Sequence, residues 1–156
     1  MLAASEMILT SRGQFRSLPW LGPADDRTSP MRSPVRVMVV DDDERVRRIA
    51  ARMLREEGYQ VIEAKSAEQA LERLADTGEI QLVLADIVMP GGMNGVELTE
   101  KILAGEPRCR VVLMSGYDRQ FPKWDSAGVR VPLLIKPFTA DQLSQQVEEV
   151  LKGGIH

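Results

Sequence analysis

The sequence has very few of the residues that form covalent cross-links, zinc sites or nucleophile–base pairs. Its 156 residues include one cysteine, Cys109, and one histidine, His156, which is the last residue. A single cysteine excludes an internal disulfide and a cysteine-based zinc cluster. A single terminal histidine argues against catalysis by a Ser–His or Cys–His pair.

Long apolar runs and a strong charge of either sign are also missing. No segment approaches the roughly 18 apolar residues of a membrane span, and the N-terminus carries Glu6 where a signal peptide would be apolar. The net charge of -3 and the pI of about 5.3 give no electrostatic case for nucleic acid or a membrane as partner. With 44% hydrophobic and 28% charged residues, the chain is expected to be a cytoplasmic globular protein.

The first 34 residues differ in composition from the rest. They hold four of the nine prolines and show no sustained periodicity. We therefore predict a flexible N-terminal extension over residues 1–34 and one folded domain over 35–152.

Short apolar runs alternate with helical patterns from Val35 onward. Pro132 lies inside the last of these runs, residues 131–135, and predicts an edge strand, because proline cannot donate to a β-ladder. Residues 117–128 contain Pro122 and Gly128 and leave room only for a short or irregular helix. Strands are predicted at 35–40, 59–63, 81–85, 110–114 and 131–135.

The predicted helices have clear starts and apolar faces. Ser66 with Gln69, Asn94 with Glu97 and Thr139 with Gln142 are capping-box pairs, and an earlier helix is expected over 44–57, ended by Gly58. The inner face of that first helix is predicted to comprise Val46, Ile49, Ala50, Met53 and Leu54.

Alternation of apolar strands with helices predicts an α/β fold. Five βα units imply a parallel sheet covered on both faces, and right-handed crossovers make it doubly wound. With the strand order 2-1-3-4-5, the carboxyl ends of the strands converge, and ligands bind at this edge in such sheets.

Polar residues stand where the predicted strands end. The first strand runs into Asp41, Asp42 and Asp43, the third into Asp86, the fourth into Ser115 and the fifth into Lys136. Clustered carboxylates repel one another unless a cation intervenes, and hard oxygen ligands suit Mg²⁺. A hydroxyl, an ammonium and Mg²⁺ around one carboxylate are what a phosphoryl group on that carboxylate would need.

These residues lie in motifs that resemble the receiver domain of two-component response regulators. The matching stretches are VVDDD at 39–43, LADIVMP at 84–90, MSG at 114–116 and KPF at 136–138. The resemblance covers about Val35 to Leu151. It implies the CheY-like, flavodoxin-like (βα)5 fold, and it implies that Asp86 is the phosphoacceptor.

The resemblance also implies roles for the neighbouring residues. Asp42 would bind Mg²⁺ directly, Asp41 would bind it through water, and the backbone carbonyl of Val88 would be a further ligand. Ser115 would bind a phosphoryl oxygen, and Lys136 would pair with the phosphoryl group.

Two positions depart from the family pattern. Leu133 stands three residues before the lysine, where receivers often have a switching aromatic, and Tyr117 is the nearby aromatic that we expect to gate the site instead. Val88, two residues after Asp86, offers no polar group to orient an attacking water, so we predict a long-lived phosphoryl group. Asp43 is expected to begin the first helix, where the helix dipole favours an acid.

The function expected from the sequence is that of a stand-alone receiver. A sensor histidine kinase or histidine phosphotransfer protein would phosphorylate Asp86, and the output would be protein–protein interaction or onward phosphotransfer, because only KGGIH follows Leu151. Catalysis would be limited to the chain's own phosphorylation and dephosphorylation. A fragment of a hybrid kinase remains an alternative reading of the chain's extent.

Three other functions remain open. A phosphorylation-independent binding module is compatible with Leu133 and the weak fourth helix. An Mg²⁺-dependent phosphohydrolase with an aspartate nucleophile would want a second acid where Val88 stands. A nucleotide-binding domain would want a glycine-rich turn after the first strand, and DDDERV contains no glycine.

Overall fold

The computed structural model describes residues 5–9, 15–18, 34–106, 108–116, 124–126 and 129–153. The chain divides into two compact units, Met1–Ser33 and Pro34–His156. In the first unit, β1 (Ser5–Leu9) pairs with β2 (Phe15–Leu18) in antiparallel fashion. The sequence had indicated no regular element here, because strands of four and five residues carry little periodicity. The prediction of a flexible extension stays a prediction.

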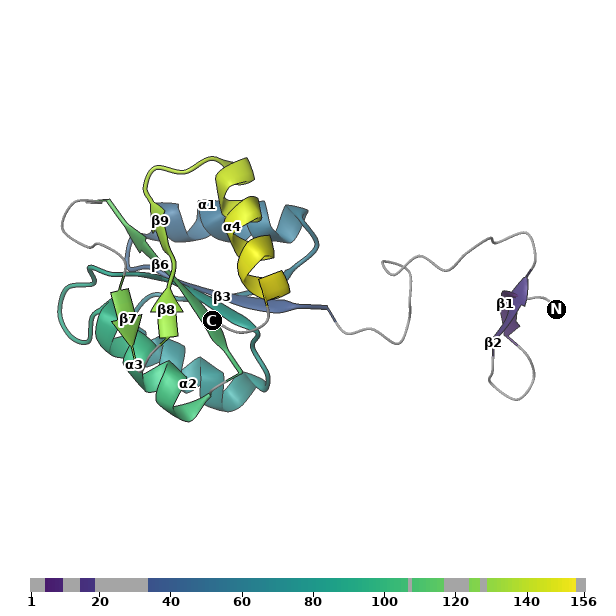
Figure 1. Cartoon of the computed structure of the whole chain (residues 1–156), viewed down its shortest axis with the longest axis horizontal. Helices are drawn as coiled ribbons and strands as arrows, with labels where there is room; N and C mark the ends of the chain where they lie inside the picture. Colours follow the sequence, from purple (N-terminus) through teal and green to yellow (C-terminus); the bar gives the residue numbers. More distant parts are fainter. Residues whose placement is uncertain are drawn as a thin grey trace. The chain divides into compact units, whose positions relative to one another are not determined.

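The second unit is built on a five-stranded parallel sheet (Figure 1). Its strands lie in the order β4-β3-β5-β6-β9, which is 2-1-3-4-5 when the five are numbered along the chain. The predicted doubly wound, flavodoxin-like order is confirmed. The bounds of the strands are Arg36–Val40 for β3, Gln60–Ala64 for β4, Leu82–Asp86 for β5, Arg110–Ser115 for β6 and Leu133–Ile135 for β9.

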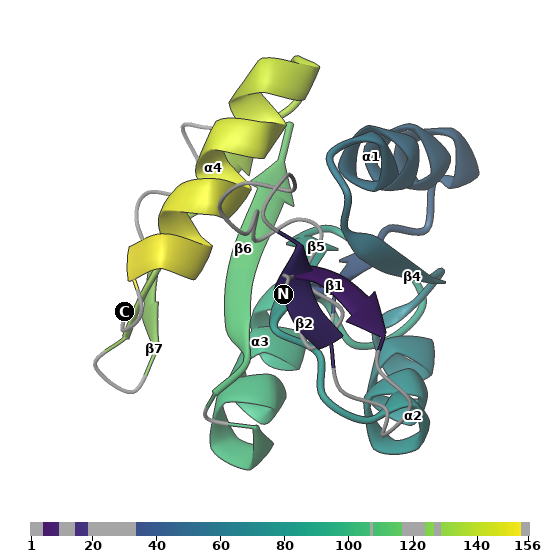
Figure 2. The same ribbon diagram turned by 90° about the vertical axis from the view of Figure 1, so that its right-hand side faces the viewer.

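Four helices of the described residues cover the two faces of this sheet. Figures 1 and 2 show α1 and α4 on one face and α2 and α3 on the other. None of these helices is long and apolar enough to span a membrane. Their bounds are Glu44–Glu56 for α1, Ala67–Thr77 for α2, Gly95–Gly105 for α3 and Ala140–Gly153 for α4.

The sheet separates two apolar cores, because successive side chains of a strand point to opposite faces. In β3, Val37 and Val39 pack with Leu54 of α1 and Leu143 of α4. The alternate residues of β3 face the other core, which includes Leu98 and Ile102 of α3. Each core contains residues that are far apart in the sequence, so their packing fixes the strands relative to one another.

The helix starts agree with the sequence except for one detail. Asn94 and Glu97 form a reciprocal capping box, and Thr139 and Gln142 exchange the same two hydrogen bonds. At α2, Ser66 accepts from the amide of Gln69. However, the Gln69 side chain accepts from Lys65, not Ser66, so the predicted box is displaced by one residue.

The buried face of α1 is rotated from the predicted one. Ala50, Ala51 and Leu54 are fully buried, whereas Ile49 is 54% exposed, so its predicted core position is wrong. At 100° per residue, Ile49 lies beyond the edge of the strip centred on Ala50 and Leu54. The same strip includes Arg47, which is only partly exposed.

The last predicted strand is divided in the structure. Residues 131–135 do not form one strand: β8 (Val129–Val131) pairs antiparallel with β7 (Trp124–Ser126), and β9 begins after Pro132. Pro132 has no amide to continue a ladder, although its carbonyl accepts from Leu113 at 2.9 Å. β9 is at the sheet edge as predicted. Where a short or irregular helix was expected, the described part of 117–128 is strand β7.

Candidate functional site

The carboxyl ends of four sheet strands meet at one edge and bring the predicted site residues together. Asp86 ends β5 and Ser115 ends β6, while Asp41 and Lys136 directly follow β3 and β9. The parallel register aligns Asp86 with Met114 and Ser115 with Ile135. The site is therefore built by strand pairing between segments far apart in the sequence.

Asp41 is completely buried, and all of its polar groups have partners. One carboxylate oxygen accepts from the amide of Asp43 at 2.9 Å, and the other accepts from Lys136 Nζ at 2.9 Å. Its backbone amide donates to the carbonyl of Ala64 at 3.2 Å. A buried carboxylate is tolerated when it is paired and hydrogen-bonded in this way.

Lys136 joins the two buried acids. Its Nζ lies 2.9 Å from Asp41 Oδ2 and 3.4 Å from Asp86 Oδ2. Burial by itself lowers the pKa of Lys136, but the hydrogen bond to Asp41 and the charges of both carboxylates raise the pKa above its ordinary value. Its backbone amide donates to the carbonyl of Ser115 at 2.8 Å, which fastens the end of β9 to β6.

Asp86 lies in a site that does not fully compensate its charge. Its exposed fraction is 7%, and burial, followed by the neighbouring charge of Asp41, raises the pKa of Asp86 to about 6. Lys136 and the backbone amide of Val88 act in the opposite direction but do not cancel this. The edge of the sheet therefore holds more negative charge than Lys136 neutralises, which favours a further cation.

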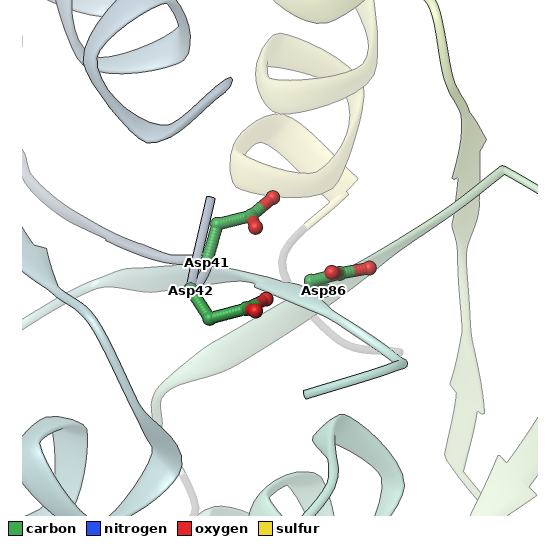
Figure 3. Close-up of side chains that lie close together, drawn as sticks. All are labelled: Asp41, Asp42 and Asp86. Atoms are coloured by element: carbon green, nitrogen blue, oxygen red, sulfur yellow. The ribbon is translucent and has the colours of Figure 1, made fainter. Parts of the chain in front are cut away.

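Asp42 completes a group of three carboxylates suited to a divalent ion. Oxygens of Asp41, Asp42 and Asp86 all lie within 4.8 Å of one another, and Figure 3 shows the Asp42 carboxylate directed toward Asp86. Asp42 is exposed, so an ion bound there would keep contact with water. This all-oxygen, partly exposed set fits Mg²⁺, which retains several water ligands.

The third acid of the run has the separate role predicted for it. Asp43 is the N-cap of α1 and accepts from the amides of Arg45 at 2.9 Å and Val46 at 3.3 Å. Its side chain is committed to the helix start, where the exposed amides and the helix dipole favour an acid.

Gly95 is a site-forming residue that the sequence analysis missed. A Cβ at this position would overlap the carbonyl oxygen of Asp86, and the Gly95 amide donates to the carbonyl of Ile87 at 2.9 Å. The loop between β5 and α3 therefore folds back closely over Asp86. The sequence carried a weak signal, a glycine directly after the N-cap Asn94, but it did not show what Gly95 would touch.

Glu68 of α2 holds the same loop from the other side. Its carboxylate accepts from the amide of Met93 at 3.0 Å, and this hydrogen bond lowers the pKa of Glu68 below its ordinary value. Nothing in the sequence pattern pointed to this contact, because Glu68 reads as one of many exposed helix acids.

The structure describes three of the remaining predicted site residues but not the fourth. Ser115 is buried, Val88 is 53% exposed beside Asp86, and Leu133 packs partly buried at the start of β9. The carbonyl of Val88 as a metal ligand stays a prediction. Tyr117 lies outside the described residues, so its gating role also stays a prediction.

Comparison with known families gives a consistent match over the second unit. The family model described as the response regulator receiver domain matches residues 37–148. The sensor kinase CckA of Brucella abortus is 32% identical over 129 residues, which are 81% of this chain but only 14% of that kinase. The response regulator receiver protein CpdR of the same organism is 31% identical over 74% of this chain and 96% of its own length.

Solved structures of receivers superpose on the same unit. The receiver domain of the hybrid histidine kinase CckA matches with a TM-score of 0.63 and 34% identity, over 74% of this chain and 98% of that one. The response regulator TrrA of Thermotoga maritima, determined in complex with Mg²⁺ and BeF, matches with a TM-score of 0.66 and 30% identity, over 75% and 99%.

Proposed function

The chain belongs to the response regulator receiver family of two-component systems, and from this membership we propose that it accepts a phosphoryl group on Asp86 and signals through a partner protein. The donor would be a sensor histidine kinase or a histidine phosphotransfer protein. The output would be protein–protein interaction or onward phosphotransfer, in the cytoplasm. Its chemistry would be confined to its own phosphorylation and dephosphorylation.

One observation carries the proposal: the buried Asp86 lies beside an ammonium group and two further carboxylates. Lys136 Nζ lies 3.4 Å from the Asp86 carboxylate, and Asp41 and Asp42 are close enough to hold a metal ion with it. This combination supplies a nucleophile, a cation for the incoming phosphoryl oxygens and a place for Mg²⁺.

In the transfer step, an Asp86 carboxylate oxygen would attack the phosphorus of a phosphohistidine. A P–O bond forms to Asp86, the P–N bond breaks, and the departing imidazole takes up a proton. Asp86 must be ionised to attack, and a pKa of about 6 leaves it largely ionised above neutral pH. The Lys136 ammonium and the Ser115 hydroxyl would then pair with phosphoryl oxygens.

The metal ligands in this proposal are residues of the same strand ends. Asp42 and Asp86 would bind Mg²⁺ directly, Asp41 would bind it through water, and the Val88 carbonyl would complete the protein ligands. The bound ion would neutralise charge on the phosphoryl group. The similar TrrA was determined in complex with Mg²⁺ and BeF, which supports a Mg²⁺ site in this chain.

The signal would leave the site through β9. Phosphorylation adds a charge of roughly -1.5 to -2 next to Lys136. The backbone amide of Lys136 is hydrogen-bonded to Ser115, and the residues that precede Lys136 form β9. β9 and α4 line a groove of about 330 Å³ bounded by Leu133, Leu134, Ile135, Gln142, Gln145, Gln146 and Glu149. A shift of Lys136 toward the phosphoryl group would move one wall of this groove, where we place the partner surface.

The test is the intact mass of the protein after incubation with Mg²⁺ and acetyl phosphate. Wild type is expected to gain one phosphoryl group, and Asp86→Ala is expected to gain none. Asp76→Ala, which removes an exposed acid on α2, is the matched control and should gain one.

Each outcome has a distinct meaning. A gain retained in Asp86→Ala would show that another residue is the acceptor. No gain in wild type, either with acetyl phosphate or with a phosphorylated histidine kinase, together with no Mg²⁺ binding, would contradict the proposal and favour the phosphorylation-independent binding module.

A further inference from the structure

Arg47 is a charged residue on the inner face of α1. Its side chain is only 15% exposed, and it lies on the same strip of the helix as the fully buried Ala50, Ala51 and Leu54. Arginine is rarely buried unless its donors are paired. The contacts of Arg47 therefore indicate why it is there.

The guanidinium of Arg47 connects three separate parts of the fold. Its Nη1 donates to the backbone carbonyl of Asp41 at 2.9 Å, and its Nε donates to Glu63 Oε1 on β4 at 3.2 Å. Glu63 in turn contacts Arg55, about two helical turns further along α1, at 3.4 Å. Arg47 is thus held by β4 while it holds the residue that follows β3.

The carbonyl that Arg47 binds has a special position. It belongs to the peptide group that joins Asp41 to Asp42, and peptide groups are planar. A hydrogen bond to this oxygen fixes the plane from which Asp42 continues. The Asp42 side chain itself is exposed, so packing does not hold its direction.

We propose that Arg47 is a positioning residue that orients Asp42 toward Asp86 by fixing the Asp41–Asp42 peptide group. The inference rests on the proposed function, because it assigns the orientation a purpose in binding Mg²⁺. Arg47 does not touch the ion or the phosphoryl group; it acts through the backbone of Asp41.

Electrostatics predict the opposite effect, which makes the proposal testable. Removing a positive charge near three carboxylates would strengthen the binding of a cation. Losing the fixed peptide plane would weaken it. A weaker Mg²⁺ affinity in Arg47→Ala would therefore report geometry and not charge.

The experiment is a calorimetric titration of the full-length, unphosphorylated chain with MgCl₂. Arg47→Ala is expected to bind Mg²⁺ on the order of 5–10-fold more weakly than wild type, equivalent to about 1–1.4 kcal/mol. Arg47→Lys, which keeps the charge but lacks the rigid planar guanidinium that donates to both partners, should fall between the two. Arg48→Ala is the control, since Arg48 is exposed and pairs with Glu44 on the solvent side; it should bind as tightly as wild type or slightly more tightly.

A second readout separates positioning from stability. In the metal-free protein, the amide of Asp43, which donates to Asp41 Oδ1, should exchange with deuterium faster in Arg47→Lys and Arg47→Ala than in Arg48→Ala. A general loss of stability would instead accelerate exchange across the core strands. Should Arg47→Ala fail to fold, Arg47→Lys decides the question.

The proposal is overturned if folded Arg47 variants bind Mg²⁺ as tightly as wild type. Failure of the proposed function gives a different result, because wild type and Arg48→Ala would then also fail to bind Mg²⁺.

Discussion

Asp86 combines two demands that oppose each other at the scale of a single residue. The proposed phosphoryl transfer requires Asp86 to be buried enough to exclude water from a phosphoryl group, yet ionised enough to attack phosphorus. Burial and the Asp41 charge raise the pKa of Asp86 to about 6, while Lys136 acts against this shift. The pKa of Asp86 therefore lies close to neutral pH, and the ionisation of this carboxyl depends on the charges of its neighbours.

This raised pKa makes folding stability depend on pH. The folded state holds the Asp86 proton more tightly than the unfolded chain, whose pKa is near 3.8. The stabilisation is thus fully present below about pH 4 and is lost as the pH rises to about 6. Asp86→Asn should remove this loss of stability and stabilise the metal-free protein at pH 7.5 by about 1–2 kcal/mol. This is less than the full pKa shift of Asp86 implies, because water and structural relaxation screen the charge.

Urea unfolding at pH 5 and pH 7.5 without Mg²⁺ measures this effect. Asp76→Asn on the surface of α2 is the control and should follow wild type. An Asp86→Asn variant that is less stable than wild type at pH 7.5 would show that the carboxylate is not destabilising in the folded state.

Val88 bears on the lifetime of the phosphoryl group. Its side chain is 53% exposed two residues after Asp86, where it can neither donate to nor accept from an attacking water. We expect phosphorylated wild type to persist well beyond seconds in Mg²⁺ buffer, and Val88→Gln to lose phosphate faster. Loss of phosphoryl mass after removal of acetyl phosphate measures both rates; decay of wild type within seconds would contradict the prediction.

At the scale of an element, the start of α3 determines the shape of the site. Gly95 is the first residue of this helix, and a side chain there would meet the backbone of Asp86 and Ile87. The close contact between α3 and the end of β5 thus depends on a missing Cβ. This explains why the loop carrying Val88 can return over Asp86.

Substituting the two end glycines of α3 tests this explanation. Gly95→Ala should destabilise the fold by about 3 kcal/mol or more, because the contact is with backbone that cannot move aside. Gly105→Ala, at the other end, meets nothing within 4 Å and should be neutral or stabilising by up to about 0.5 kcal/mol. Equal urea midpoints for the two variants would contradict the close approach at Gly95.

At the scale of the whole molecule, the chain divides into two compact units, Met1–Ser33 and Pro34–His156. The buried core side chains described in the second unit lie between Val37 and Val147. A chain beginning at Pro34 should therefore unfold at the same urea concentration as the full-length protein, and it should gain the same single phosphoryl group. A lower midpoint that corresponds to a loss of more than about 1 kcal/mol in the free energy of unfolding would show that residues 1–33 contribute to folding stability.

Local signals in the sequence were enough to predict a five-stranded parallel sheet and the polar residues that follow its strands. Short, mostly apolar runs such as 81–85, helices capped by Asn94 and Thr139, and acids placed after strands are local signals. Each can be recognised without knowing any long-range contact. Right-handed crossovers then leave few topologies for such a pattern. For this reason Asp41, Asp42, Asp86, Ser115 and Lys136 could all be assigned to one edge.

The neighbours of these residues depend on how the separate elements pack, which local signals do not show. Periodicity placed Ile49 in the core, but the packing of α1 on the sheet turned it outward and drew Arg47 in. The division of the last strand at Pro132 depended on pairing between β7 and β8. The Gly95 contact with Asp86 and the Arg47 bond to Asp41 likewise arise only when separate elements are packed together, because register and helix rotation are set by the whole core and not by any one segment.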